Sequence, residues 1–105
     1  MAIEELLGQL TLEEKCSLLS GSAFWYTQAV ERLGIRKLML TDGPHGLRKQ
    51  VENADHLGLN KSVPATCFPT AATMANSWDE ELEQKVGVAL GEESMEEEVN
   101  VLLGP

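Results

Sequence analysis

The stretch LMLTDGPHGLRKQ, from Leu38 to Gln50, decides the fold of this chain. Its first residues, Leu38 to Thr41, form a short apolar run bounded by turn residues, which predicts a strand buried on both faces. Asp42 is the last residue of that strand, and a Gly-Pro pair ends it. Ligands of parallel α/β proteins bind outside the carboxyl ends of strands, so the pattern predicts a site for a polar ligand near Asp42 and Arg48.

The residues before this strand predict two short helices. Thr11 opens the second helix with a capping box, in which its hydroxyl and the Glu14 carboxylate each accept a hydrogen bond from the other residue's backbone amide. We expect Gly21 to end that helix in a left-handed conformation. Helical spacing predicts the apolar faces. These are Ile3, Leu6, Leu7 and Leu10 in the first helix, and Leu12, Cys16 and Leu19 in the second.

The residues after the strand alternate between loop, strand and helix. Lys49 to Val63 has little periodicity and is typical of a long solvated loop. We expect a second short strand at Ala65 to Phe68 and a helical turn at Ala71 to Ala75. Ser77 should start a long helix that runs to about Glu97, and a third buried strand should follow at Val99 to Leu103. The buried stripe of the long helix is predicted to be Trp78, Leu82, Val86, Ala89 and Leu90. Gly87 and Gly91 should let a neighbouring backbone approach it closely.

This order of elements predicts the fold class. Strands that alternate with crossover helices pair in parallel, and the handedness of the crossovers winds them into an α/β layer or barrel. The Glu-rich run EESMEEE is most simply the solvated face of the long helix.

Composition and charge exclude several classes of partner. The 105 residues are 43% hydrophobic, enough for an ordinary core, and carry a formal charge of −9. That charge repels nucleic acid and anionic membrane surfaces, so neither is expected as a partner. The N-terminus has no basic leader region, and no apolar run approaches the roughly 18 to 20 residues that span a bilayer. We expect a cytoplasmic protein. Cys16 and Cys67 are expected to be two buried free thiols, and the alternative is a disulfide between them.

Several side chains have both a functional and a structural interpretation. Asp42 could accept two sugar hydroxyl bonds, or could only initiate a turn. Arg48 could bind a ligand oxygen, or could pair with Asp42 or Glu52 and hold the loop. His45 has no nucleophile or metal partner in view. The aromatic cluster Phe24, Trp25 and Tyr26 is expected to be core, and could alternatively form the floor of a sugar site.

Three blocks of sequence together cover nearly the whole chain: LTLEEKCSLLSG, then ERLGI followed by LTDGPHGLR, then FPTAATMANSWDEEL with VNVLLGP. In order and spacing they resemble the N-terminal region of glycoside hydrolase family 3 β-glucosidases. Two residues depart from the family pattern. Arg36 stands where proline is common, and Glu98 stands where glycine usually ends the helix before VNVLLGP.

The resemblance implies a (β/α)8 barrel of TIM type, of which residues 1–105 would be the N-terminal portion. Residues 1–36 would be leading helices, and 37–105 the first strands and helix of the barrel. It implies retaining hydrolysis of terminal β-D-glucosyl residues, without a metal or an organic cofactor. Asp42 would hold hydroxyls of the sugar, and Arg48 would contribute to the same pocket.

The same resemblance places the catalytic carboxyl groups elsewhere. The nucleophile aspartate and the acid/base glutamate are expected beyond Pro105, so this chain would supply binding residues and no catalytic ones. Its partners would be a β-glucoside or oligosaccharide and the rest of the parent enzyme. Alone, the fragment should be inactive and could self-associate through uncovered apolar faces. The alternative is a stand-alone, inactive acidic binding or interaction module derived from the barrel.

Overall fold

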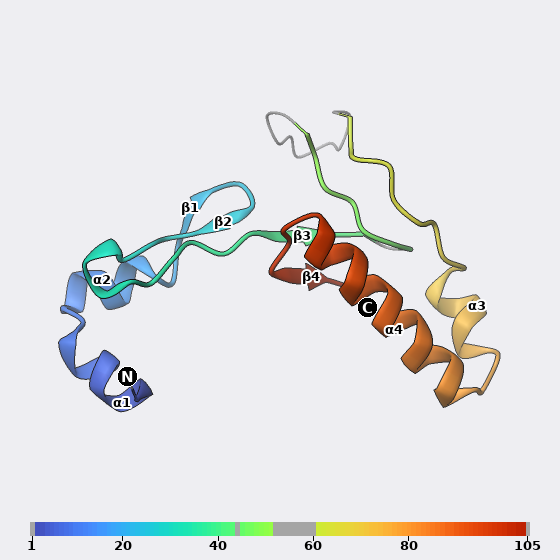
Figure 1. Ribbon diagram of the computed structural model, residues 1–105, viewed down its shortest axis with the longest axis horizontal. Coiled ribbons are helices and arrows are strands. Elements are labelled where there is room, and N and C mark those ends of the chain that lie inside the picture. Colours follow the sequence, from blue (N-terminus) through green and yellow to red (C-terminus); the bar gives the residue numbers. More distant parts are fainter. Residues whose placement is uncertain (1, 44, 52–60, 105) are drawn as a thin grey trace. The chain divides into compact units, whose positions relative to one another are not determined.

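The structure is a computed structural model that describes residues 2–43, 45–51 and 61–104 (Figure 1). The chain forms two compact units, Met1–Met39 and Leu40–Pro105. No helix in the described ranges is long and apolar enough to cross a membrane.

The first unit contains both predicted leading helices. They are α1 (Ile3–Gln9) and α2 (Leu12–Ser17). The predicted capping box is confirmed: the Thr11 hydroxyl accepts from the Glu14 amide at 3.2 Å, and the Glu14 carboxylate accepts from the Thr11 amide at 2.9 Å. A short antiparallel hairpin that the sequence pattern did not predict follows. It consists of β1 (Gly21–Ala23) and β2 (Tyr26–Thr27), and a 3-10 turn, η1 (Glu31–Leu33), comes after it.

The Glu14 carboxylate also accepts hydrogen bonds from Arg32. Nε of Arg32 lies 3.1 Å from Oε1 and its Nη2 lies 2.6 Å from Oε2, a bidentate arrangement. The same Nη2 donates to the backbone oxygen of Gln9 at 3.0 Å. One guanidinium therefore joins the end of α1, the start of α2 and η1. The hydrogen bond from Arg32, with that from the Thr11 amide, lowers the pKa of Glu14 below its ordinary 4.5, and the pKa of Arg32 is raised in turn.

The predicted end and apolar face of the second helix are wrong. Helix α2 ends at Ser17, whose hydroxyl donates to the Glu14 carbonyl at 2.8 Å, and Gly21 begins β1. Serine side chains that bond helix carbonyls compete with the helical pattern, which explains the early end. Leu12 is 72% exposed and Leu19 is 90% exposed. Cys16 is exposed as well, because this short helix turns no face into a core.

The two thiols and the aromatic cluster also differ from expectation. Cys16 and Cys67 are both free and exposed, so the prediction of two buried thiols is wrong. Phe24 is 43% exposed and meets the edge of the half-buried Trp25 ring, with centroids 4.8 Å apart. Lys37 Nζ lies 4.5 Å from the centre of the Tyr26 ring, a cation–π contact. The cluster therefore covers the hairpin surface and is not a core.

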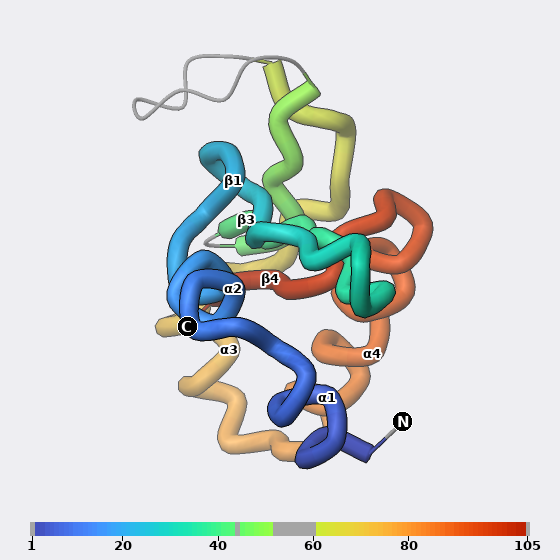
Figure 2. Tube along the Cα trace, turned by 90° about the vertical axis from the view of Figure 1, so that its left-hand side faces the viewer, coloured from blue at the N-terminus to red at the C-terminus, as the bar shows by residue number. Residues whose placement is uncertain are grey.

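The second unit is organised by a parallel pair of strands, as predicted. Strand β3 (Leu40–Asp42) pairs with β4 (Val101–Leu103) in the register Leu40↔Val101, Thr41↔Leu102 and Asp42↔Leu103. Figures 1 and 2 show the two strands side by side, with the long helix running beside them. β3 begins two residues later than expected and does end at Asp42. Its central residue, Thr41, is fully buried.

Two helices lie between these strands along the chain. They are α3 (Ala71–Ala75), as predicted, and α4 (Glu80–Glu96). The buried apolar side chains of this unit come from the turn after β3, from α3 and from the segment before β4. They are Leu47, Met74 and Val99.

Helix α4 starts later than the sequence pattern indicated. Asp79, not Ser77, is its N-cap, and its carboxylate accepts from the Leu82 amide at 3.0 Å. Ser77 instead accepts from the Asp79 amide at 3.2 Å. Serine and aspartate cap helices about equally well, so spacing alone did not decide between them. Trp78 is consequently outside the helix, left-handed at φ 53° and 92% exposed, which overturns its predicted place in the buried stripe.

The C-terminal end of α4 is a complete Schellman motif. The Glu98 amide donates to the Met95 carbonyl at 3.1 Å, and the Val99 amide donates to the Ser94 carbonyl at 2.8 Å. Glu98 adopts φ 57°, the left-handed conformation that glycine usually supplies at this position. The departure from the family pattern at Glu98 therefore keeps the helix stop and adds backbone strain.

Two further expectations for this unit are not met. Ala65 to Phe68 forms no strand, because the Thr66 amide donates to the Glu93 carboxylate and the Phe68 amide donates to the His45 carbonyl. A Cβ added at Gly87 or Gly91 would meet nothing within 4 Å, so no backbone in the described chain packs closely against them.

The predicted loop Lys49 to Val63 is described only at its ends, where Gln50 and Ser62 form an antiparallel bridge. Glu52 and Pro44 lie outside the described residues.

Replacing Arg32 should change the titration of Glu14. A carboxyl whose pKa is lower in the folded than in the unfolded chain stabilises the fold above pH 4.5, and that contribution is lost as the pH falls through the folded pKa. We predict that Arg32→Gln raises the pKa of Glu14 toward 4.5, measured by an NMR titration of its side-chain carboxyl. Arg36→Gln removes the same charge away from Glu14 and should leave the titration unchanged. Identical Glu14 titrations in the Arg32 variant and the unmodified chain would contradict the assignment.

Glycine at position 98 should stabilise the chain. A non-glycine residue in the left-handed region costs about 1 to 2 kcal/mol, and the entropy of glycine offsets part of that gain. We predict that Glu98→Gly raises the free energy of unfolding by about 1 kcal/mol in urea titrations followed by circular dichroism. The matched control, Glu96→Gly in the last turn of α4, should lower it by about 1 kcal/mol. Equal effects of the two substitutions would mean that Glu98 is not strained.

Candidate functional site

The turn after β3 brings the two predicted ligand-binding residues together. Asp42 and Arg48 form an isolated antiparallel bridge, in which the Arg48 amide donates to the Asp42 carbonyl at 3.0 Å. The hydroxyl of the buried Thr41 donates to the Arg48 carbonyl. Hydrogen bonds from the Arg48 amide and the Thr41 hydroxyl therefore hold the two ends of the turn together. The side chains of Asp42 and Arg48 start from neighbouring points at the carboxyl end of β3.

Two glycines allow this turn to close. A Cβ on Gly43 would lie 1.5 Å from the Gly46 carbonyl oxygen and 3.1 Å from the Arg48 amide nitrogen. A Cβ on Gly46 would lie 2.1 Å from the Thr66 carbonyl oxygen, and the φ of Gly46 is +152°. Real Cβ atoms do not approach backbone atoms so closely, so no other residue fits these positions without moving the turn. The glycines of the DGPHG motif are therefore needed for close packing as well as for turning.

The Asp42 side chain has unused capacity to accept hydrogen bonds. Its Oδ1 atom is buried and has no hydrogen-bond partner among the described residues. No ion pair joins it to the half-buried Arg48 within the part of the chain that the structure describes. The described residues therefore do not show the alternative in which the Arg48 guanidinium forms an ion pair with the Asp42 carboxylate. A buried carboxylate oxygen without a donor is costly, and ligand hydroxyl groups would satisfy it.

Two glutamates at the C-terminal end of α4, Glu93 and Glu97, bind segments next to the turn, which the sequence pattern did not predict. Glu93 Oε1 accepts from the Thr66 amide at 2.9 Å and from the Thr66 hydroxyl at 3.1 Å. The Lys49 ammonium donates to the backbone carbonyl of Glu97 at 2.5 Å and lies 3.5 Å from its carboxylate. Both glutamates belong to the run that was interpreted as a solvated face. Their helical spacing of four residues was a signal that they share one side of α4.

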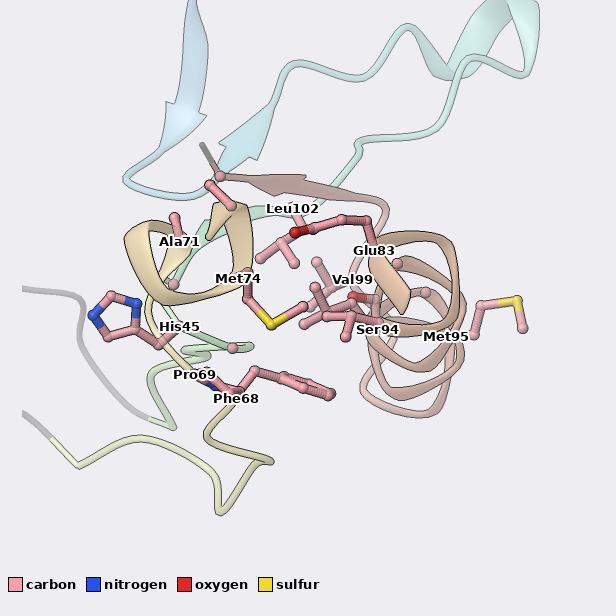
Figure 3. A pocket seen from close by; sticks show the side chains of 18 of the residues that line it. His45, Phe68, Pro69, Ala71, Met74, Glu83, Ser94, Met95, Val99 and Leu102 are labelled. Atoms are coloured by element: carbon pink, nitrogen blue, oxygen red, sulfur yellow. The ribbon is translucent and has the colours of Figure 1, made fainter. Parts of the chain in front are cut away.

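A cavity of about 770 Å³ borders this turn within the second unit (Figure 3). Met74 of α3 points across it toward Ser94 and Val99, whereas Met95 points away on the other side of α4. His45 lies at the left of the view with its ring directed outward, and the Phe68 ring extends below Met74 toward α4. Its walls are mostly apolar, and neither Asp42 nor Arg48 lines it. The cavity therefore lies between the turn, α3 and α4, and the side chains of Asp42 and Arg48 are not part of its walls.

No three His, Cys, Asp or Glu side chains among residues 2–43, 45–51 and 61–104 are grouped so that they could hold a metal ion. The imidazole of His45 is exposed, while its backbone carbonyl accepts from the Phe68 amide at 2.7 Å.

Comparison with curated proteins finds long matches to short parts of glycosidases. The chain is 60% identical over 103 residues to the thermostable β-glucosidase B of Acetivibrio thermocellus, which covers 98% of this chain and 14% of that protein. It is 56% identical over 97 residues to an exo-α-(1->6)-L-arabinopyranosidase of Bifidobacterium longum, covering 91% of this chain and 13% of that protein. The chain thus spans about a seventh of the length of these relatives.

Solved structures agree with the sequence matches. A β-glucosidase from Kluyveromyces marxianus in complex with glucose superposes with a TM-score of 0.87 at 36% identity, covering 100% of this chain and 12% of that one. The GH3 β-glucosidase of Bifidobacterium adolescentis superposes with a TM-score of 0.79 at 50% identity, covering 94% and 13%. No family model matches the chain. Over nearly all of its 105 residues, the chain is homologous to the β-glucosidases of glycoside hydrolase family 3 and matches a small part of them in structure.

Proposed function

We propose that this chain supplies part of the glucose-binding subsite of a retaining β-glucosidase, with Asp42 and Arg48 as substrate-binding residues. One observation carries the proposal: a buried carboxylate oxygen of Asp42, without a hydrogen-bond partner in the described chain, lies at the carboxyl end of a parallel strand. Ligands of parallel α/β folds bind at that end of the strands. The bound glucose of the homologous Kluyveromyces marxianus enzyme supports the choice of ligand.

We place the chain in the N-terminal portion of a (β/α)8 barrel. The parallel register of β3 and β4, with α4 between them along the chain, supports this placement. Such a unit brings the carboxyl ends of its strands to one face, where barrel enzymes build their active sites. Asp42 ends β3 at that face, and its partner in the register is Leu103 of β4.

In this proposal the residues of the chain bind and orient the sugar. The Asp42 carboxylate accepts hydrogen bonds from sugar hydroxyls, and Arg48 offers guanidinium donors beside it. Charged hydrogen bonds that strengthen as the glycosidic bond breaks lower the barrier. Retaining hydrolysis also needs two carboxyl groups about 5 to 5.5 Å apart, a nucleophile and an acid/base. The family resemblance assigns neither role to a residue of this chain.

The proposal concerns the ring hydroxyls of a pyranose and not one particular sugar. A relative that is 56% identical over nearly the whole chain acts on an arabinopyranoside. Glucose and arabinopyranose are both pyranoses with several ring hydroxyls, so a carboxylate that accepts from such hydroxyls serves either sugar. The proposal therefore commits Asp42 to ring hydroxyls and leaves discrimination between sugars to other residues.

Removing the Asp42 carboxylate should impair turnover in a complete enzyme. A suitable host is the Acetivibrio thermocellus β-glucosidase in which this chain replaces the 103 matching residues, called the chimera below. Loss of two charged hydrogen bonds is worth about 3 kcal/mol, so Asp42→Ala should lower kcat/KM for an aryl β-glucoside about 100-fold. Asp79→Asn makes a similar change at the cap of α4, where asparagine also caps, and should leave kcat/KM unchanged. Unchanged kcat/KM in the Asp42 variant would make Asp42 a turn residue only.

The purified 105-residue chain should not hydrolyse an aryl β-glucoside by itself. It would supply binding groups without the pair of carboxyl groups that breaks the glycosidic bond. The measurement is release of the aryl alcohol, compared with a mock preparation made from cells without the gene. Release above the mock level, abolished by substitution of a glutamate or aspartate in these 105 residues, would overturn the assignment of roles.

A further inference from the structure

We propose that Glu93 is a positioning residue for the sugar site: by holding Thr66 from helix α4, it holds the turn that carries Asp42 and Arg48. This inference rests on the proposed function of Asp42 and adds a residue that touches no sugar. Glu93 and Thr66 are 27 residues apart in sequence, and their contact is the link between α4 and the segment before α3.

The first contact in this chain of interactions is between α4 and Thr66. One oxygen of the Glu93 carboxylate accepts from both the amide and the hydroxyl of Thr66, at 2.9 and 3.1 Å. The other oxygen, Oε2, is buried without a hydrogen-bond partner among the described residues. Hydrogen bonds to an ionised carboxylate are about twice as strong as neutral ones. Because they satisfy the Thr66 backbone amide, they also replace the strand pairing that the sequence pattern predicted there.

The second contact is between the Thr66 segment and the turn. The carbonyl oxygen of Thr66 occupies the place where a side chain on Gly46 would begin, 2.1 Å from that ideal Cβ position. Two residues further on, the Phe68 amide donates to the His45 carbonyl at 2.7 Å. Thr66 and Phe68 therefore touch His45 and Gly46 backbone to backbone, without a flexible side chain between them.

The third contact is inside the turn and reaches the sugar-binding residues. The Gly46 carbonyl lies against Gly43, at 1.5 Å from an ideal Cβ there, and Gly43 follows Asp42 directly. The Arg48 amide is bonded to the Asp42 carbonyl. Backbone atoms in such direct contact transmit a displacement, because no flexible side chain stands between them to absorb it. A shift of Thr66 should therefore move Asp42 and Arg48.

The decisive experiment is a double-mutant cycle in the chimera. Glu93→Ala should lower kcat/KM for an aryl β-glucoside about 10- to 100-fold, as expected when a binding group is misplaced by about 1 Å. If Glu93 acts through Asp42, its removal should cost much less once Asp42 is alanine, so the double variant should resemble Asp42→Ala alone. Glu93→Gln, which keeps Oε1 as an acceptor, should recover part of the loss. Glu92→Ala, the exposed neighbour on α4, should leave kcat/KM unchanged.

The outcomes separate this inference from the proposed function. An unchanged kcat/KM for Asp42→Ala refutes the function. A large effect of Asp42→Ala combined with no effect of Glu93→Ala, or with fully additive losses, refutes the positioning role and leaves the function standing.

A second measurement uses the 105-residue chain and needs no activity. If the contacts transmit the displacement, Glu93→Ala should shift the NMR amide resonances of Gly43, Gly46 and Arg48 as well as that of Thr66. Glu92→Ala should shift none of these four. Shifts confined to Thr66 and α4 in the Glu93 variant would refute the positioning role.

Discussion

The parallel pairing of β3 with β4 is the constraint on which the second unit depends. It joins residues about sixty positions apart, with Leu40 opposite Val101 and Asp42 opposite Leu103. The buried Thr41 hydroxyl, bonded to the Arg48 carbonyl, turns the chain back immediately after the strand. Because the pairing closes a long loop, it carries an entropic cost that other contacts within the unit must offset. The position of Asp42 at the strand end is therefore a consequence of the whole unit and not of the DGPHG turn alone.

Local signals with a single interpretation were predictive. The capping box of Thr11 and Glu14 and the strand that ends at Asp42 follow from short patterns, and the parallel pairing of strands follows from the order of the elements. Patterns with two equivalent solutions were not predictive. Ser77 and Asp79 are both good caps, and the choice of Asp79 moved Trp78 from a predicted core to the surface. Helical periodicity also assumes a partner for every apolar face, and Leu12 and Leu19 have none in the described chain.

The candidate site could be predicted only where its residues lie in one motif. Asp42 and Arg48 are six positions apart, and the turn between them is encoded by its glycines. Thr66 and Glu93 join the same neighbourhood through tertiary contacts, which neither residue signals locally. The glutamate run was interpreted by its charge as solvated, yet Glu93 and Glu97 both bind the loop segments beside the turn. The proposed site thus depends on the last turns of α4, where the Schellman motif and Glu98 set where the helix ends.

We propose that the unsatisfied carboxylate oxygen of Asp42 accepts a hydrogen bond from a sugar hydroxyl. The most direct measurement is a crystal structure of the chimera with glucose bound. We predict a glucose hydroxyl within hydrogen-bond distance of Asp42 Oδ1, about 2.5 to 3.0 Å, with Asp42 of β3 opposite Leu103 of β4. Bound glucose that leaves Asp42 bonded only to protein groups would contradict it.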